Sequence, residues 1–429
     1  MRTPSRSTLA ALACTLLVGL AVGCGNARHA AGVTIHVSDW GGASADPNMA
    51  RFQRTIMDHW RHLHPDIHIR WEHIPGSTEY VSKMLTAFVA GTEPDVMSLD
   101  ASSAAVFIDN GCLKDLAPLA RRDHVDLGAY WPNVLAMEAR GRRLYALPGD
   151  FTPMVMFYNK KLFQRAHLPY PQDDWTWADF LNDCRALTVW PRGALHPTQY
   201  GFLAQNWMPA WIPFIWQNGG DVLSPNGKRA EGYIDSPATI AAVTFYAGLV
   251  QQHLAPSLSQ TQAQGADPFE NGLCAMEITG HWSLVGIKAS DTINLSDVGV
   301  VALPQNVRRV TVIYESGFAV TAHTRHPEAA WLFAQYMSSP YVQIKKAALG
   351  IGISGNRAVA MARASSNPLE PAFLRAVPAG IAPWGARVED YAQVEDIGTE
   401  MMQDVLIGGM SPAVALRQAA ARIDPELNS

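Results

Sequence analysis

Two predicted loops combine a carboxylate with other polar or aromatic groups directly after a strand. Asp39 and Trp40 follow a strand at 33–37, and Asp100 follows a strand at 94–100. In a parallel sheet, ligands meet the loops at the carboxyl ends of the strands. Carboxylates accept hydrogen bonds from hydroxyl groups, and indole rings pack flat on C–H faces. These residues are therefore candidates for ligand binding. The alternatives are a helix cap for Asp100 and loop packing for Asp39 and Trp40.

Metal and cofactor chemistry finds little support. Five histidines lie close together in the sequence: His59, His62, His64, His68 and His73. A predicted helix ends between the third of them and the next strand, and no ligand spacing such as HExxH is present. No P-loop, GxSxG or GxGxxG motif occurs in a suitable context. We therefore expect a solvated helix end, no metal, no cofactor and no enzymatic activity.

The first part of the chain alternates strands with helices. Helices at 47–63 and 78–90 separate strands at 33–37, 66–71 and 94–100. The helices repeat apolar residues at helical spacing, and two of the strands alternate apolar with polar residues. This order predicts an α/β fold with a parallel sheet covered by helices.

A nearly continuous apolar run at 144–163 has a Pro and a Gly near its start. Such a run predicts a buried strand that leaves one packed body and enters another. Asp150 lies at this crossing and is a candidate to face a cleft. The alternative is a hydrogen bond within the hinge.

A block rich in Trp and Pro follows at 190–218. Its prolines and low charge predict an irregular segment. Of Trp207, Trp211 and Trp216, we expect one or two to contact a ligand and the rest to fill a core.

Composition bounds the class of protein. The chain has 429 residues, 48% of them apolar and 17% charged, with a net charge of −5. This length predicts two domains or more, and the apolar fraction allows large cores. Because no long basic run is present, we expect no nucleic-acid partner.

The N-terminus has the features of a targeting segment. Arg2 and Arg6 precede an apolar stretch at 9–22 that is too short for a good membrane span. The stretch ends in Leu20-Ala21-Val22-Gly23-Cys24, which resembles a bacterial lipobox, so Cys24 is the predicted lipid attachment site. The alternative is a plain secretory signal cleaved after Gly23. Cys112, Cys184 and Cys274 allow at most one disulfide, and buried free thiols are expected.

Several phrases of the sequence together resemble the extracellular solute-binding proteins of sugar ABC importers, the maltose-binding-like group. They occur in the family's order: 90–96, 110–116, 144–160, 175–180, 269–282 and 317–320. The resemblance implies two α/β lobes of the periplasmic-binding-protein fold, joined by crossing strands, with the ligand in the cleft between them. It implies a return crossing near 314–317, opposite Asp150, so that Asp150 and Glu315 should come near each other.

On this basis we divide the chain as follows. Residues 1–24 form a lipoprotein signal peptide and 25–32 a tether. The N-terminal lobe comprises 33–151 and 317–359, and the C-terminal lobe comprises 152–314 and 360–429. The resemblance further implies a monomer outside the cytoplasm, anchored to the membrane through its N-terminal lipid, which binds a small-molecule sugar and is recognised by ABC permease transmembrane subunits.

The resemblance also adds candidate ligand residues: Trp282 as a stacking aromatic, Glu315 and Gly317 at the return crossing, and Arg357 in a loop that departs from the family's pattern. Trp and carboxylates outnumber cations among the candidates, which favours a neutral or amine-bearing saccharide. One alternative is a ligand such as glycerol 3-phosphate or a glycerophosphodiester, which would need cationic or backbone N–H donors. Another is a secreted carbohydrate-active hydrolase that uses a pair among Asp100, Asp150 and Glu315.

Overall fold

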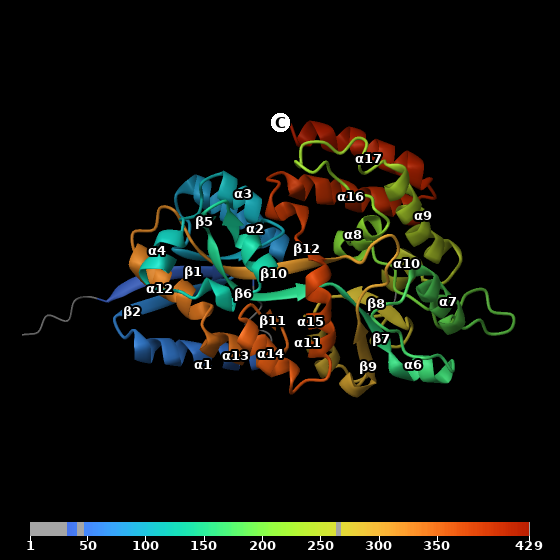
Figure 1. Ribbon diagram of the computed structural model, residues 1–429, viewed down its shortest axis with the longest axis horizontal. Coiled ribbons are helices and arrows are strands. Elements are labelled where there is room, and N and C mark those ends of the chain that lie inside the picture. The colour runs from blue at the N-terminus through green and yellow to red at the C-terminus, as the bar shows by residue number, and fades with distance from the viewer. Residues whose placement is uncertain (1–31, 41–46, 263–266, 429) are drawn as a thin grey trace, which may run out of the picture.

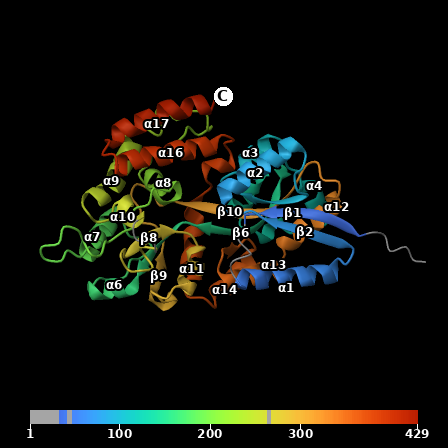
Figure 2. The ribbon, with the colours of Figure 1, turned by 180° about the vertical axis from the view of Figure 1, so that it is seen from behind.

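The computed structural model describes residues 32–40, 47–262 and 267–428. The expected signal peptide, tether and lipid site at Cys24 lie outside these residues. The molecule has two lobes side by side, and β6 and β10 run from one into the other (Figure 1). Figure 2 shows the same arrangement from behind.

The first lobe is built on a seven-stranded sheet of order β11-β6-β10-β3-β1-β2, with β12 beside β10. The strands β1 to β3 are parallel, as predicted, whereas β10 runs antiparallel to both β3 and β6. The strand bounds are β1 (Val33–Asp39), β2 (Ile67–His73), β3 (Val96–Asp100), β6 (Ala146–Pro153), β10 (Thr311–Val320), β11 (Ile353–Ser354) and β12 (Gly380–Ile381).

Helices cover both faces of this sheet, because its strands carry apolar side chains on both sides. On one face, Ile35 and Phe318 pack with Trp60 of α1. On the other face, Leu99 packs with Tyr80 of α2. The helices of this lobe are α1 (Pro47–Leu63), α2 (Ser77–Ala90), α3 (Ala104–Asp109), α4 (Ala117–Arg122), α5 (Pro132–Leu135), α12 (Pro327–Met337) and α13 (Pro340–Leu349), with the small hairpin β4 (Ala139–Arg140) and β5 (Arg143–Leu144).

The predicted crossing run becomes two strands. β6 belongs to the large sheet, and β7 (Val155–Asn159), one residue later, belongs to the three-stranded sheet β8-β7-β9 of the second lobe. Every residue of β7 is buried, which explains the continuous apolar run. Beside the crossing, β10 shifts register between Ser316 and Gly317. A Cβ atom on Gly317 would lie 2.4 Å from the carbonyl oxygen of Leu147, so only Gly fits there.

The second lobe packs its remaining helices around the three-stranded sheet. Its elements are α6 (Lys160–Arg165), α7 (Trp177–Leu187), α8 (Met208–Gln217), α9 (Pro237–Gln251), α10 (Leu258–Gln262), β8 (Met276–Thr279), α11 (Ser283–Ala289), β9 (Val298–Val301), α16 (Tyr391–Leu406) and α17 (Pro412–Glu426). Thr176 caps α7 through a capping box and Ser236 caps α9, both as predicted.

The expectation of an irregular segment at 190–218 is wrong for its last third, which forms α8. Pro209 lies in the first turn, where a missing N–H costs no helical hydrogen bond. Pro213 lies inside the helix, yet all ten residues of α8 are buried. Burial on all sides therefore outweighs the hydrogen bond that Pro213 cannot donate.

A third connection follows the two crossing strands. It comprises β11, α14 (Arg357–Ala364), α15 (Glu370–Ala376), β12 and the 3-10 turn η5 (Trp384–Ala386), which leads into α16. Its Phe373 lies in one core with Met137 of the first lobe and Phe157 of the second. The crossing is thus a packed region shared by both lobes.

Cys112, Cys184 and Cys274 are free and buried, as expected. Among the described residues, no helix combines the length and apolarity that a membrane crossing requires. The described part of the chain also contains no group of three or more potential metal ligands.

Candidate functional site

Two carboxylates meet where the strands cross. The strand register places Ser316 of β10 opposite Asp100 of β3 on one side and Asp150 of β6 on the other. Glu315, the neighbour of Ser316, lies opposite Phe151. The expected proximity of Asp150 and Glu315 is therefore confirmed.

Asp150 is held by a cation from the first lobe. Lys346 of α13 forms an ion pair with its Oδ2, and the Ser316 hydroxyl donates to the same oxygen at 3.3 Å. Both charged side chains remain partly exposed, at 15% for Asp150 and 24% for Lys346. Asp150 thus takes part in a hinge hydrogen bond, as the alternative stated, without being withdrawn from solvent.

Asp100 caps the turn that precedes α3. Its Oδ1 accepts from the Ser102 backbone N–H at 2.8 Å and from the Ser102 hydroxyl. Burial raises the pKa of Asp100, and the nearby negative charge of Asp150 raises it further, while the two bonds from Ser102 lower it. The alternative interpretation of Asp100 as a cap is therefore confirmed for Oδ1.

Glu138 and Glu315 form a buried carboxyl pair behind Asp100 and Asp150. Their side chains are 0% and 1% exposed. Burial raises the pKa of both groups, and the charge of each neighbour raises the pKa of Glu315 further. No N–H or hydroxyl group of the described residues donates to their oxygens. The two carboxyls satisfy each other only when a proton is shared between them.

A further carboxylate reaches this region from the second lobe. Glu395 of α16 has its pKa raised to about 7, first by burial and then by the negative charge of Asp100. The hydroxyl of Tyr314 senses both carboxylates, which raise its pKa in addition to burial. Asp100 and Glu395 therefore face each other from opposite lobes.

The second lobe also presents two exposed indole rings. Trp207 precedes α8 and is 41% exposed, and Trp282 follows β8 and is 36% exposed. Their ring centroids lie 5.9 Å apart in an edge-to-face arrangement. By contrast, Trp211 and Trp216 are 1% and 2% exposed and lie in the core of this lobe.

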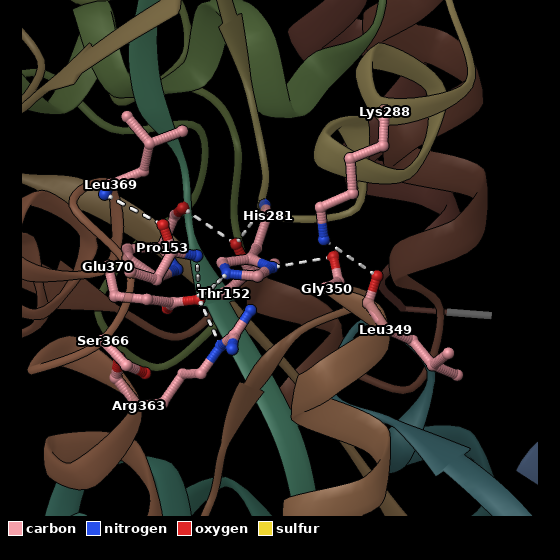
Figure 3. A network of polar contacts seen from close by, with 11 residues as sticks. Thr152, Pro153, His281, Lys288, Leu349, Gly350, Arg363, Ser366, Leu369 and Glu370 are labelled. Atoms are coloured by element: carbon pink, nitrogen blue, oxygen red, sulfur yellow. Dashed lines mark hydrogen bonds and ion pairs between the residues drawn. The ribbon is translucent and has the colours of Figure 1, made fainter. Parts of the chain in front are cut away.

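A polar network fixes the loop that carries Trp282 (Figure 3). The backbone N–H of His281 donates to Thr152 Oγ1 of β6 at 2.8 Å. The His281 ring lies 2.9 Å from the Gly350 carbonyl oxygen through Nδ1 and 2.9 Å from Glu370 Oε1 through Nε2. Both oxygens accept hydrogen bonds when Glu370 is ionised, so the ring donates twice and is positively charged.

The network joins both lobes. His281 belongs to the second lobe and Gly350 ends α13 of the first, while Glu370 begins α15 of the third connection. Lys288 of α11 donates to the neighbouring carbonyl of Leu349 at 3.2 Å. Two cations of the second lobe thus contact the C-terminal end of α13, where the helix dipole favours positive charge.

The remaining candidates make local contacts. Asp39 accepts from Trp71 Nε1 at 3.1 Å and lies 2.5 Å from His73 Nδ1, and Trp40 packs on Tyr80. Arg357 begins α14 and lies over the Trp131 ring, 5.4 Å from its centroid. The local contacts of Asp39 and Trp40 match the loop-packing alternative.

Sequence reasoning missed Glu138, Glu395, Lys346 and His281. Each is brought to the crossing by an element distant in sequence from β6 and β10, and no local pattern marks it. His281 alone carried a signal, because it stands in the family-like phrase at 269–282.

Comparison with known proteins supports the architecture. The ABC substrate-binding protein Lmo0181 of Listeria monocytogenes, solved in complex with cycloalternan, has a TM-score of 0.82 and 21% identity, over 92% of this chain and 99% of that chain. The sugar-binding protein MalE of Xanthomonas citri has a TM-score of 0.78 and 23% identity, over 92% and 98%. UgpB of Mycobacterium tuberculosis, in complex with glycerophosphocholine, has a TM-score of 0.76 and 20% identity, over 92% and 98%.

At these identities the solved structures establish the fold alone, the two-lobed periplasmic-binding-protein fold. A sequence-family model, that of the bacterial extracellular solute-binding proteins, matches residues 42–344, more than half of the chain. The chain therefore belongs to the bacterial extracellular solute-binding protein family.

Proposed function

We propose that this chain is the substrate-binding lipoprotein of an ABC importer, which captures a carbohydrate between its lobes and delivers it to membrane permease subunits. The observation that carries the ligand class is the exposed pair Trp207 and Trp282. A hydrogen bond between His281 and Thr152 anchors this pair to β6, two residues from Asp150.

The chemistry of these groups supports a sugar. Flat indole faces pack on the C–H faces of a pyranose ring, while carboxylates such as Asp100 and Asp150 accept hydrogen bonds from its hydroxyls. Proteins of similar fold are described with cycloalternan and with α-D-tagatose. We propose Trp207, Trp282, Asp100 and Asp150 as the principal ligand contacts.

Binding without turnover is the primary test. Purified protein is mixed with a panel of oligosaccharides, and Trp fluorescence and product formation are followed together. We expect saturable quenching and unchanged sugar. Turnover that disappears in Asp100→Asn or Asp150→Asn would instead establish a hydrolase.

The ligand class is tested by thermal shift with sugars, polyols and phosphoesters. The site region is rich in carboxylates, which repel phosphate, so we expect sugars to raise Tm. A shift with glycerophosphodiesters alone would overturn the carbohydrate proposal and keep the transport role.

Membrane anchoring remains a separate proposal. It rests on the sequence around Cys24 and on membership of an extracellular family. Mass spectrometry of the membrane fraction should find a diacylated Cys24, and Cys24→Ala should release the protein. A membrane-bound Cys24→Ala variant would contradict lipid attachment at this residue.

A further inference from the structure

The region between the lobes holds carboxylates with too few cations. Asp100 comes from the first lobe and Glu395 from the second, and each is only partly buried. The negative charge of Asp100 acts on Glu395 and on Tyr314 between them. Among the described residues, no Lys, Arg or His forms an ion pair with Asp100 or Glu395.

A second observation is independent of those two groups. The Glu138 and Glu315 side chains are fully buried, and their four oxygens receive no hydrogen bond from any described N–H or hydroxyl. Their charge acts toward Asp100 and Asp150. Unpartnered carboxyls at this depth add negative potential to the side on which Asp100 lies.

The nearby cations are already engaged. Lys346 pairs with Asp150. Arg140 weakly offsets Glu138 through space, but its hydrogen bonds go to the carbonyls of Ala139 and Ala386. Arg387 lies over the Trp384 ring, 3.8 Å from its centroid, and interacts with Asp221. None of the three neutralises Asp100 and Glu395.

Like charges on opposite lobes oppose the approach of those lobes. The cost falls if a carboxylate takes up a proton or if a cation enters between them. A neutral sugar offers hydroxyl donors but leaves both charges in place. An ammonium group donates up to three hydrogen bonds and also cancels charge.

We propose that the captured ligand carries a protonated amine, held between Asp100 of the first lobe and Glu395 of the second. This inference rests on the proposed function and narrows it: the ligand class is an amine-bearing saccharide. Trp207 and Trp282 contact the sugar face, while the two carboxylates select the charge.

The first experiment compares matched ligands by thermal shift and calorimetry. The pairs are glucosamine with glucose, galactosamine with galactose, and chitosan oligomers with cello-oligosaccharides of equal length, at pH 7 and low salt. We expect an amino member to bind at least about tenfold more tightly than its neutral partner and to weaken as salt is added. Equal or tighter binding of the neutral members overturns this inference and leaves the proposed function standing. Absence of binding by every member overturns both.

The second experiment removes one charge with little change of shape. Glu395→Gln should abolish the preference for the amine, whereas Asp396→Asn, at the exposed neighbouring position of α16, should keep it. Glu395→Gln should also raise the Tm of the ligand-free protein, because it removes repulsion from Asp100. A lower Tm together with an unchanged amine preference would show a merely structural residue and overturn the proposal.

Proton release provides a third readout. Glu395 has its pKa raised to about 7, so it is partly protonated at pH 7. A bound ammonium lowers this pKa, and the proton leaves. Calorimetry in buffers of different ionisation enthalpy should show proton release on amine binding by the native protein and less by Glu395→Gln. Proton uptake with an amino sugar would contradict the assigned contact.

Discussion

Trp282 lies at the junction of an exposed aromatic surface and a buried polar network, so one side chain depends on two kinds of interaction. Its ring is 36% exposed beside Trp207, while its neighbour His281 is fully buried. The loop is therefore rigid where it is anchored and open where a ligand would pack.

Removing this ring should weaken sugar binding without unfolding the protein. We expect Trp282→Ala to raise the Kd for the preferred sugar about tenfold, since stacking and burial of one aromatic face contribute about 1–2 kcal/mol. Calorimetry measures the change. The matched control is Trp190→Ala, which removes an indole of similar exposure, 48%, that contacts His253 elsewhere on this lobe. Equal losses in both variants would contradict a specific role for Trp282.

The charge of Glu395 should appear in the pH dependence of stability. Its pKa is raised from 4.5 to about 7 in the folded protein. A folded protein that holds this proton more tightly than the unfolded chain is stabilised at low pH, and the contribution is lost as pH rises from about 4.5 to 7.

We therefore expect chemical denaturation of the ligand-free protein to show a term from Glu395, on the order of 2 kcal/mol, that favours the folded state at pH 5 over pH 7. The difference between native protein and Glu395→Gln across this range isolates it. A native-minus-variant difference that does not change with pH would contradict the buried, charge-coupled environment of Glu395.

At the scale of elements, the C-terminal end of α13 is where the second lobe docks on the first. His281 and Lys288 contact its last carbonyls, and Lys346 of the same helix pairs with Asp150. Because Glu370 lies on the third connection, a single ion pair ties three chain segments together.

Breaking this pair should be costly. We expect His281→Gln or Glu370→Gln each to lower the free energy of unfolding by about 3 kcal/mol, because each leaves a buried partner unsatisfied. The double variant should lose less than the sum of the two. In the control pair, His323 and Glu93, the histidine side chain is 77% exposed, so His323→Gln should change stability by less than about 0.5 kcal/mol. Additive losses for His281 and Glu370 would show that they do not act together.

The elements themselves were largely predictable, and the site was only partly so. Apolar periodicity located α1 to within its bounds, and Thr176 and Ser236 marked helix starts, because these signals are local. Pro213 misled the prediction for α8, since its cost is offset by burial that appears only after folding. Glu138 and Glu395 gave no signal, because their unusual environments arise from contacts between distant segments.

At the scale of the whole molecule, two strands and a third segment connect the lobes around one shared core. Such an arrangement allows hinge closure, and a ligand that contacts both lobes favours the closed state.

Ligand-driven closure predicts a measurable change of distance. With spin labels at Val89 of α2 and Val414 of α17, both exposed and on opposite lobes, we expect the interlabel distance to change when the preferred ligand is added. The Asp100→Asn variant, which keeps the fold but weakens ligand contact, should need more ligand for the same change. A distance that stays constant at saturating ligand would contradict closure.

The position of β10 has a consequence for how the protein is made. In the large sheet β10 lies between β6 and β3, although it follows both lobes' earlier strands in the chain. A nascent polypeptide that has emerged only through β9 therefore lacks the strand that separates β6 from β3. Non-local pairing of this kind delays folding. We expect the first lobe to stay incomplete until late in synthesis, which keeps the chain loose during the period when a secreted protein must be threaded through its export channel.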